Sequence, residues 1–139
     1  MALWSGRFTE GADAFTQRFG ASLPVDQRLY AEDIAGSIAH ANMLAAQGII
    51  ATVDAEAIAE GLQGILADIT SGALTFDVME SEDTHMAIEA ELTRRVGDAG
   101  ARLHTGRSRN DQVLVDLKLF LRDELRQTAE AVKTWSLSS

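Results

Sequence analysis

Apolar residues recur three and four positions apart along most of the chain, and this spacing places them on one face of an α-helix. The first stripe lies between Pro24 and Gly48, and glycine is a common C-terminal stop for a helix. A second stripe predicts a helix over residues 53–71, with Thr52 as its candidate N-cap. Because residues 49–51 form a short connection, we expect an antiparallel pair. The apolar positions are Tyr30, Ile34, Ile38, Ala41 and Ala45, then Ile58, Leu62, Ile65 and Ile69.

Two further helices are predicted in the second half of the chain. One covers about residues 82–96, with Ser81 as its candidate N-cap. The other begins near Ser108 and continues to the end of the sequence. Its stripe has an average spacing of about 3.5 residues, which is typical of a long helix in a bundle. The stripe consists of Leu114, Leu117, Leu121, Leu125, Thr128, Val132 and Trp135.

The first twenty residues carry widely spaced apolar and aromatic side chains between glycines. This pattern predicts an extended arm with one short helix near residues 13–18. Elsewhere the chain is rich in Ala, Leu, Ile, Glu and Gln, and it lacks the alternating run of Val, Thr and Tyr that a strand would show. The sequence therefore predicts an all-α fold.

The charge of the chain argues against two classes of partner. With 139 residues, 12 Lys and Arg and 21 Asp and Glu, the formal net charge is −9. Phosphate binding relies on basic residues, so we expect neither a nucleic-acid nor an anionic membrane partner. The chain has no Cys, no signal-peptide pattern at its start and no apolar run near the ~18 residues of a membrane helix. We expect a cytoplasmic protein.

Residues 104–112 are the segment best suited to chemistry. They hold two Arg, a His, a Gly, hydroxyls and amides, an unusual excess of hydrogen-bond donors in so acidic a chain. Arg offers a planar fork that matches a carboxylate, and a helix N-terminus adds partial positive charge. The alternative is an ordinary helix start, because Ser108 and Asp111 fit the pattern of a capping hydroxyl followed by an acid. The residue types alone support both interpretations equally.

Three sequence blocks carry a resemblance to a known family. Residues 104–113, HTGRSRNDQV, closely resemble the first signature block of the argininosuccinate lyases. Residues 3–8, LWSGRF, are similar to that family's LWGGRF, with Ser5 in place of a glycine. Residues 32–37, with 39–41 after them, resemble its first long helix. The resemblance extends to about Trp135, and the chain is identified as an N-terminal part of a member.

The resemblance implies a member of the fumarase/aspartase superfamily, whose enzymes release fumarate from a succinyl group. In this family argininosuccinate is split into arginine and fumarate without a metal or organic cofactor. Residues 1–108 would form an N-terminal helical domain with its arm. Residues 109–135 would begin a helix of the central bundle. Residues 136–139 do not resemble the family's continuation and are expected to be a non-native or disordered tail.

The resemblance also assigns site residues. It implies substrate contacts by Ser22, Arg109 and Asn110. It further implies a cleft lined by Asp26, Asp83, His85, Thr105 and Ser108. From the residues alone, Ser22 and Asp26 fit turn and cap positions. His85 also fits a hydrogen-bonded core histidine, and the mid-helix His40 is interpreted as a packing residue.

Two later blocks of the family are not found in these 139 residues: a Thr-His pair and a Gly-Ser-rich loop that would supply the acid and the base. The resemblance implies that the three blocks come from three subunits of a homotetramer. We therefore expect no catalytic residue here, one wall of a site, no activity of the isolated chain, and self-association through its last helix. The alternatives are another fumarate-releasing lyase of the superfamily, or a structural protein like the lens crystallins recruited from the family.

Overall fold

Every regular element in the described part of the chain is a helix. The computed structural model describes residues 13–137. Its elements are α1 (Ala14–Gly20), α2 (Leu23–Asp26), η1 (Gln27–Leu29), α3 (Tyr30–Ala46), α4 (Thr52–Ser71), α5 (Thr84–Val96), α6 (Asp98–Ala101), η2 (Arg102–His104) and α7 (Arg109–Leu137). The expected all-α fold is confirmed for these residues. The predicted extended arm falls mostly on residues 1–12, which lie outside the described part, as do Ser138 and Ser139.

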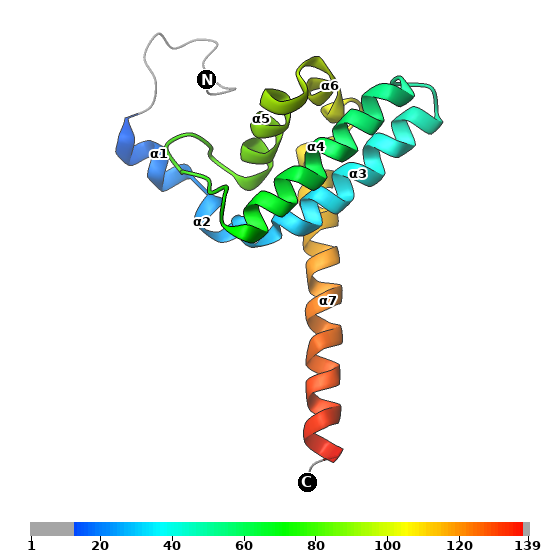
Figure 1. Cartoon of the computed structure of the whole chain (residues 1–139). Helices are drawn as coiled ribbons and strands as arrows, with labels where there is room; N and C mark the ends of the chain where they lie inside the picture. Colours follow the sequence, from blue (N-terminus) through cyan, green and yellow to red (C-terminus); the bar gives the residue numbers. More distant parts are fainter. Residues whose placement is uncertain (1–12, 138–139) are drawn as a thin grey trace.

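The core lies between α3, α4 and α5. Helices α3 and α4 run antiparallel side by side, as their short connection predicts, and α5 packs against α4 (Figure 1). The apolar stripes of these three helices meet in one buried cluster. Burying each large aliphatic side chain stabilises the fold by roughly 1.5–3 kcal/mol. The largest members are Ile34 and Leu44 from α3, Ile58, Leu62 and Ile65 from α4, and Ile88 and Leu92 from α5.

Three predicted helix starts are wrong in detail. The helix expected from Pro24 is divided into α2, η1 and α3, although its apolar stripe packs as expected. Thr52 is the first residue of α4, and the N-cap position belongs to Ala51, which has extended backbone angles. The N-cap of α5 is Asp83 instead of Ser81: the Asp83 Oδ1 atom accepts a hydrogen bond of 2.7 Å from the backbone N–H of Met86.

A neighbouring contact explains why α5 begins so late. The carbonyl oxygen of Glu82 accepts hydrogen bonds from the backbone N–H groups of Ser22 and Leu23, at 2.9 and 3.1 Å. The carbonyl oxygen of residue 82 therefore bonds to the start of α2 and not within α5. The carboxylate of Asp83 then satisfies an N–H group that the first turn leaves free.

The sequence pattern does not predict the reversal of chain direction after α5. Gly97 has φ of +64°, and α6 follows directly. A Cβ atom added at Gly100 would lie 2.9 Å from Thr93 Cα, so α6 approaches the backbone of α5 closely. A helix of four residues is too short to show a periodic stripe. This tight turn brings residues 105–108 back towards α3, where the candidate site is built.

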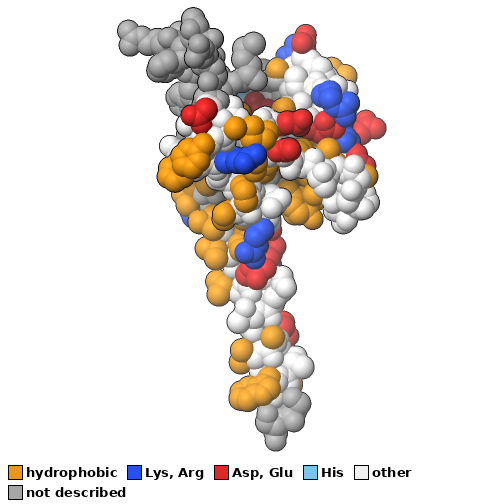
Figure 2. Space-filling view, turned by 90° about the vertical axis from the view of Figure 1, so that its left-hand side faces the viewer, with side chains coloured by type: hydrophobic (Ala, Val, Ile, Leu, Met, Phe, Trp, Pro, Cys, Tyr) orange, Lys and Arg blue, Asp and Glu red, His pale blue; other side chains and the backbone are white. Residues whose placement is uncertain are grey.

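Helix α7 leaves the other helices and projects from the domain (Figure 1). Only Gln112 and Asp116 are buried within it, and both lie near its start. Apolar side chains line the projecting part (Figure 2), and Leu125 is 68% exposed. Ser136 and Leu137 belong to this helix. Among the helices of residues 13–137, none combines the length and apolar character needed to cross a membrane.

Candidate functional site

The donor-rich segment forms the loop between η2 and α7. Gly106 turns the chain with φ of +65°, a conformation that glycine adopts without steric cost. The His40 Nε2 atom of α3 lies 2.9 Å from the carbonyl oxygen of Thr105 and donates to it, which anchors the loop on α3. His40 is therefore half-buried beside this loop, and its role extends beyond the packing expected from the sequence.

Arg107 points inward from this loop. Its Nη1 atom donates a hydrogen bond of 3.1 Å to Ser37 Oγ of α3. Burial lowers the pKa of the Arg107 guanidinium from its ordinary value, and the charge of Asp33 opposes that effect. Its Nε atom is buried and has no hydrogen-bond partner among residues 13–137. Arg107 thus brings positive charge to the interior, a role that the sequence reasoning missed.

Arg109 is held at the first turn of α7 by two acceptors. Its Nη1 atom donates to Gln112 Oε1 at 2.6 Å, and its Nη2 atom donates to Glu89 Oε2 of α5 at 3.2 Å. The side chain remains 28% exposed, so part of the guanidinium faces solvent. These contacts give the Arg109 fork a defined orientation at a helix N-terminus, where an anion is favoured.

Asn110 and Ser108 complete the start of α7. Both residues are exposed, as is Thr105. The Ser108 Oγ atom accepts a hydrogen bond of 3.2 Å from the backbone N–H of Asn110, and the Ser108 carbonyl oxygen accepts one from Gln112. The hydroxyl therefore serves the helix start, as the capping interpretation expects, but it bonds at residue 110 rather than at residue 111. This hydrogen bond uses only the backbone N–H of Asn110, whose side chain stays on the surface.

Ser22, Asp26 and Asp83 meet at the N-terminal end of α5. The Ser22 Oγ atom donates to Asp26 Oδ2 at 2.5 Å, and Asp26 Oδ1 accepts from the backbone N–H of Thr84 at 3.1 Å. The carboxylate of Asp26 thereby joins α2 to α5. Ser22 is exposed beside this junction.

The two groups of predicted contacts are connected by α5. Glu82 contacts the backbone of Ser22, whereas Glu89 contacts Arg109. The Ser22 group therefore lies at the N-terminal end of α5, and the Arg109 group lies beside the middle of that helix.

His85 lies in the interior, between three helices. Its Nδ1 atom is 3.1 Å from Asp33 Oδ1 of α3 and 3.4 Å from Asp116 Oδ2 of α7. The exposed fractions of His85, Asp33 and Asp116 are 2%, 1% and 1%. The Gln112 Nε2 atom also donates to Asp33 Oδ1. We call Asp33, His85 and Asp116 the buried cluster.

Mutual contacts set the charges of the buried cluster. Burial by itself lowers the pKa of His85, but the hydrogen bond and charge of Asp33 outweigh it and raise this pKa above its ordinary value. Burial tends to raise the pKa of Asp33, but His85, Gln112 and Arg107 lower it. Burial and the charge of Asp33 raise the pKa of Asp116 to about 7. Asp33 is therefore the carboxylate that stays ionised, and Asp116 is the one that retains a proton near neutral pH.

The buried cluster has residue types that bind metal ions. One ligand atom from each residue lies within 4.8 Å of the others. However, the Gln112 amide donates to Asp33, and the positive charge of Arg107 acts on both carboxylates. Positive charge and donors are thus already supplied by the protein, so the donor set favours a hydrogen-bonded ion cluster over a cation site.

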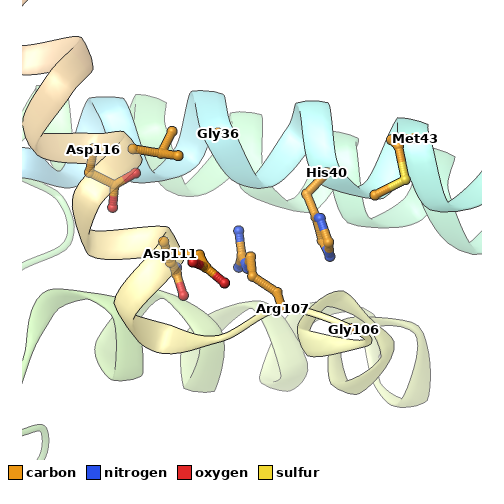
Figure 3. Close-up of a pocket in the computed structure, with 9 residues that line it drawn as sticks. Gly36, His40, Met43, Gly106, Arg107, Asp111 and Asp116 are labelled. Atoms are coloured by element: carbon orange, nitrogen blue, oxygen red, sulfur yellow. The ribbon is translucent and has the colours of Figure 1, made fainter.

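A cavity of about 330 Å³ opens between α3 and the start of α7 (Figure 3). His40 and Met43 approach it from α3, while Arg107, Asp111 and Asp116 approach it from the loop and α7. The residues that line this cavity do not include Ser22, Arg109, Asn110 or the predicted cleft residues. The cavity and the candidate contacts along α5 are therefore different features of the described chain.

The sequence analysis did not predict the burial of Gln112 and Asp116 in α7 or that of Asp33, and it selected Arg107 only as part of the donor-rich segment. Gln112 and Asp116 are four positions apart and thus share one side of α7. That spacing is a weak signal by itself, because polar pairs with it also occur on exposed helix surfaces. Their burial depends on α3 and α5, which lie far away in the sequence.

Comparisons with known proteins agree with the resemblance. A family model described as "Lyase" matches residues 6–134. The argininosuccinate lyase of Heliobacterium mobile is 56% identical over 131 residues, covering 94% of this chain and 28% of that protein. The argininosuccinate lyases of Pelobacter propionicus and Moorella thermoacetica are each 58% identical, over 88% and 90% of this chain and 27% of each relative. This chain thus spans between a quarter and a third of the length of these relatives. Since the family model covers nearly all of the sequence, the chain belongs to the lyase family.

Proposed function

We propose that the chain is the N-terminal part of an argininosuccinate lyase, which eliminates fumarate from argininosuccinate and leaves arginine. In this function it serves the last step of arginine biosynthesis in the cytoplasm. The observation that carries the proposal is the Arg109 guanidinium, oriented at the start of α7 by Gln112 and Glu89 and partly open to solvent. Identities of 52–58% to enzymes of that name support it.

In the proposed function, this chain binds the succinyl end of the substrate. Arg109 offers its planar fork to a carboxylate, and Asn110 adds an exposed amide next to it. Ser22 would contact the substrate from the N-terminal end of α5. The N-terminus of α7 adds partial positive charge towards the bound carboxylates. Asp26, Asp83, His85, Thr105 and Ser108 would shape or support this wall of the cleft.

The chemistry of the elimination requires groups beyond this wall. A base must remove a weakly acidic proton next to a carboxylate, and an acid must protonate the departing guanidino nitrogen. The resemblance assigns both groups to later blocks of the family. The 139 residues alone are therefore proposed to be inactive, with their role limited to binding, orienting the substrate and stabilising developing negative charge.

The exposed stripe of α7 supports an assembly of several copies. Residues 109–135 would enter a bundle of long helices in a homotetramer, and residues 1–108 would form the outer domain. The stripe is covered over little of its length by the rest of the described chain. A large exposed apolar surface is typical of an interface. The small-molecule partners in this proposal are argininosuccinate, arginine and fumarate.

A chimeric enzyme tests the proposed function directly. Residues 1–134 replace the matching segment of the Heliobacterium mobile argininosuccinate lyase, and fumarate release is followed by ultraviolet absorbance. We expect turnover of argininosuccinate but not of adenylosuccinate. The matched control carries Arg109→Ala in the same chimera and is expected to lose most of the activity.

Two outcomes would contradict the proposal. A chimera that folds and assembles but releases no fumarate would favour the structural, non-enzymatic alternative. Turnover of adenylosuccinate in preference to argininosuccinate would favour another lyase of the superfamily.

A further inference from the structure

A continuous line of polar contacts joins Arg109 to the buried cluster. Arg109 Nη1 donates to Gln112 Oε1 at 2.6 Å, and Gln112 Nε2 donates to Asp33 Oδ1. That same oxygen lies 3.1 Å from His85 Nδ1. The line runs from a partly exposed guanidinium into the interior through one amide group, that of Gln112.

The charge of Asp33 determines which way the Gln112 amide points. A glutamine amide has one accepting end and one donating end, whereas an ionised carboxylate only accepts. Because Asp33 takes the NH₂ group, the oxygen of Gln112 is turned towards Arg109. The reversed amide would face Arg109 with N–H groups and Asp33 with an oxygen, so that neither hydrogen bond could form. Gln112 is 4% exposed, so water cannot readily replace either partner.

The charge of the buried cluster depends on groups from every neighbouring element. Asp33 faces it from α3, and His85 with Asp83 and Glu89 belongs to α5 or its N-cap. Asp116 faces it from α7, and Arg107 from the loop before α7. These charges all act on His85, Asp116 or Arg107. A proton gained or lost by His85 or Asp116 therefore changes the field in which the Gln112 amide is held.

We propose that Gln112 is a positioning residue that orients Arg109 and transmits to it the protonation state of the buried cluster. The inference rests on the proposed function only for the role of Arg109 as a carboxylate contact. The coupling of Arg109 to the buried cluster through Gln112, which we call the relay, is a property of the described chain. In this arrangement the orientation of the Arg109 fork, and hence carboxylate binding, depends on pH through the buried cluster.

Nuclear magnetic resonance of the 139-residue chain tests the relay without any enzymatic assay. The Arg109 side-chain N–H signals and the His85 ring signals are followed from about pH 5 to pH 8, the range in which a histidine and a raised carboxyl titrate. We expect the Arg109 signals to move with the same midpoint as the buried cluster. In Gln112→Met, His85 still titrates, the Arg109 signals no longer follow it, and their exchange with water accelerates by ~10-fold or more.

A matched control separates this relay from simple loss of an Arg109 partner. Glu89→Gln neutralises the second acceptor of Arg109 and leaves Gln112 and Asp33 in place. In this variant the Arg109 signals are expected to follow the buried cluster still. Arg109 signals that never follow the cluster, or that follow it equally well in Gln112→Met, would overturn the proposal.

A second variant keeps the test decisive if Gln112→Met does not fold. Asp116→Asn preserves the shape of the buried cluster, removes one titrating carboxyl and leaves Gln112 intact. The pH midpoints of the His85 and Arg109 signal changes are expected to move together. If the midpoint for the Arg109 signals stays in place while that for the His85 signals moves, the relay is overturned. An inactive chimera with coupled signals would refute the proposed function alone, whereas an active chimera with uncoupled signals would refute the relay alone.

Discussion

The Nδ1 atom of His85 lies 3.1 Å from Oδ1 of Asp33, and the two residues are 52 positions apart in the sequence. Both side chains are almost completely buried, and they join α5 to α3. A charged pair in such a place is held by its partners, because leaving either charge alone in the interior would be costly. This pair makes the stability of the domain depend on pH.

We expect the free energy of unfolding to fall as the pH rises from about 4 to above 7. The pKa of Asp116 is raised from 3.8 to about 7 in the folded chain, so the folded state keeps a proton that the unfolded state has already released. The raised pKa of His85 extends the decline above its ordinary value of 6.5. Each unit of pKa difference corresponds to about 1.4 kcal/mol. Urea denaturation across this range measures the slope.

The control for this prediction is Asp116→Asn, which remains neutral at every pH. Its stability is expected to fall less between about pH 5 and 8 and to exceed that of the parent chain at the upper end. Asp33 and Glu91 act in the opposite sense at low pH, because their lowered pKa values stabilise the fold above about pH 4 and less so as the pH falls further. A parent chain with the same stability at pH 5 and pH 8 would contradict the burial of an ionisable Asp116.

Gly100→Ala is expected to destabilise the chain by about 1–3 kcal/mol. The added Cβ would lie 2.9 Å from Thr93 Cα and 3.0 Å from Thr93 N, and backbone atoms cannot move aside as a flexible side chain can. Thermal or chemical denaturation measures the loss. Gly20→Ala is the matched control, since its added Cβ would have no atom of another described segment within 4 Å, and it is expected to be neutral or slightly stabilising. Equal stability of the two variants would show that α6 is not packed closely on α5.

Arg109→Lys in the chimeric enzyme is expected to lower kcat/KM by about 10- to 100-fold, or ~1–3 kcal/mol of transition-state stabilisation. A lysine ammonium has no planar fork, so it cannot contact both oxygens of a carboxylate as a guanidinium does. The control is Arg102→Lys, which alters an exposed arginine of η2 that pairs with Asp54 of α4. Unchanged kinetics in Arg109→Lys would leave residues 104–112 with a helix-starting role only.

The 139-residue chain is expected to self-associate through α7. Leu114, Leu117, Leu121, Leu125 and Val132 are all between 43% and 68% exposed in the single chain. Pairing the α7 helices of two copies would bury these side chains. Full burial of each side chain would stabilise the pair by roughly 1.5–3 kcal/mol. Light scattering after size exclusion, at tens of micromolar protein, measures the mass. A monomer under these conditions would contradict the prediction.

Variants on two sides of α7 test whether the apolar stripe causes the self-association. Leu117→Glu/Leu121→Glu adds two negative charges to the stripe and is expected to yield a monomer. Arg126→Glu changes the net charge by the same amount, from +1 to −1, at a position on another side of the helix where the arginine is 70% exposed. It is expected to associate as the parent chain does. If the two variants have equal masses, the association does not involve the apolar stripe.

The sequence by itself determined the main helices and the family. Each of α3, α4 and α5 has an apolar stripe long enough to define its period, and the stripe of α4, including Ile58, Leu62 and Ile65, lies in the core as predicted. The block at residues 104–113 is distinctive because it combines several specific residues in a fixed order. The short segments were predicted less well: α6 has only four residues, and several Ser, Thr and Asp side chains near each helix start fit a cap equally well.

Only the tertiary structure decided which polar residues lie in the interior. Asp33, His85 and Asp116 are brought together by the packing of three helices, and no local pattern encodes a meeting between positions so far apart in the chain. The same packing decided which side of α7 is covered: Gln112 and Asp116 are buried, whereas the apolar stripe that the sequence pattern favours for burial stays largely exposed. A periodic pattern identifies the sides of a helix, but the contacts available to each side depend on the elements that pack against it.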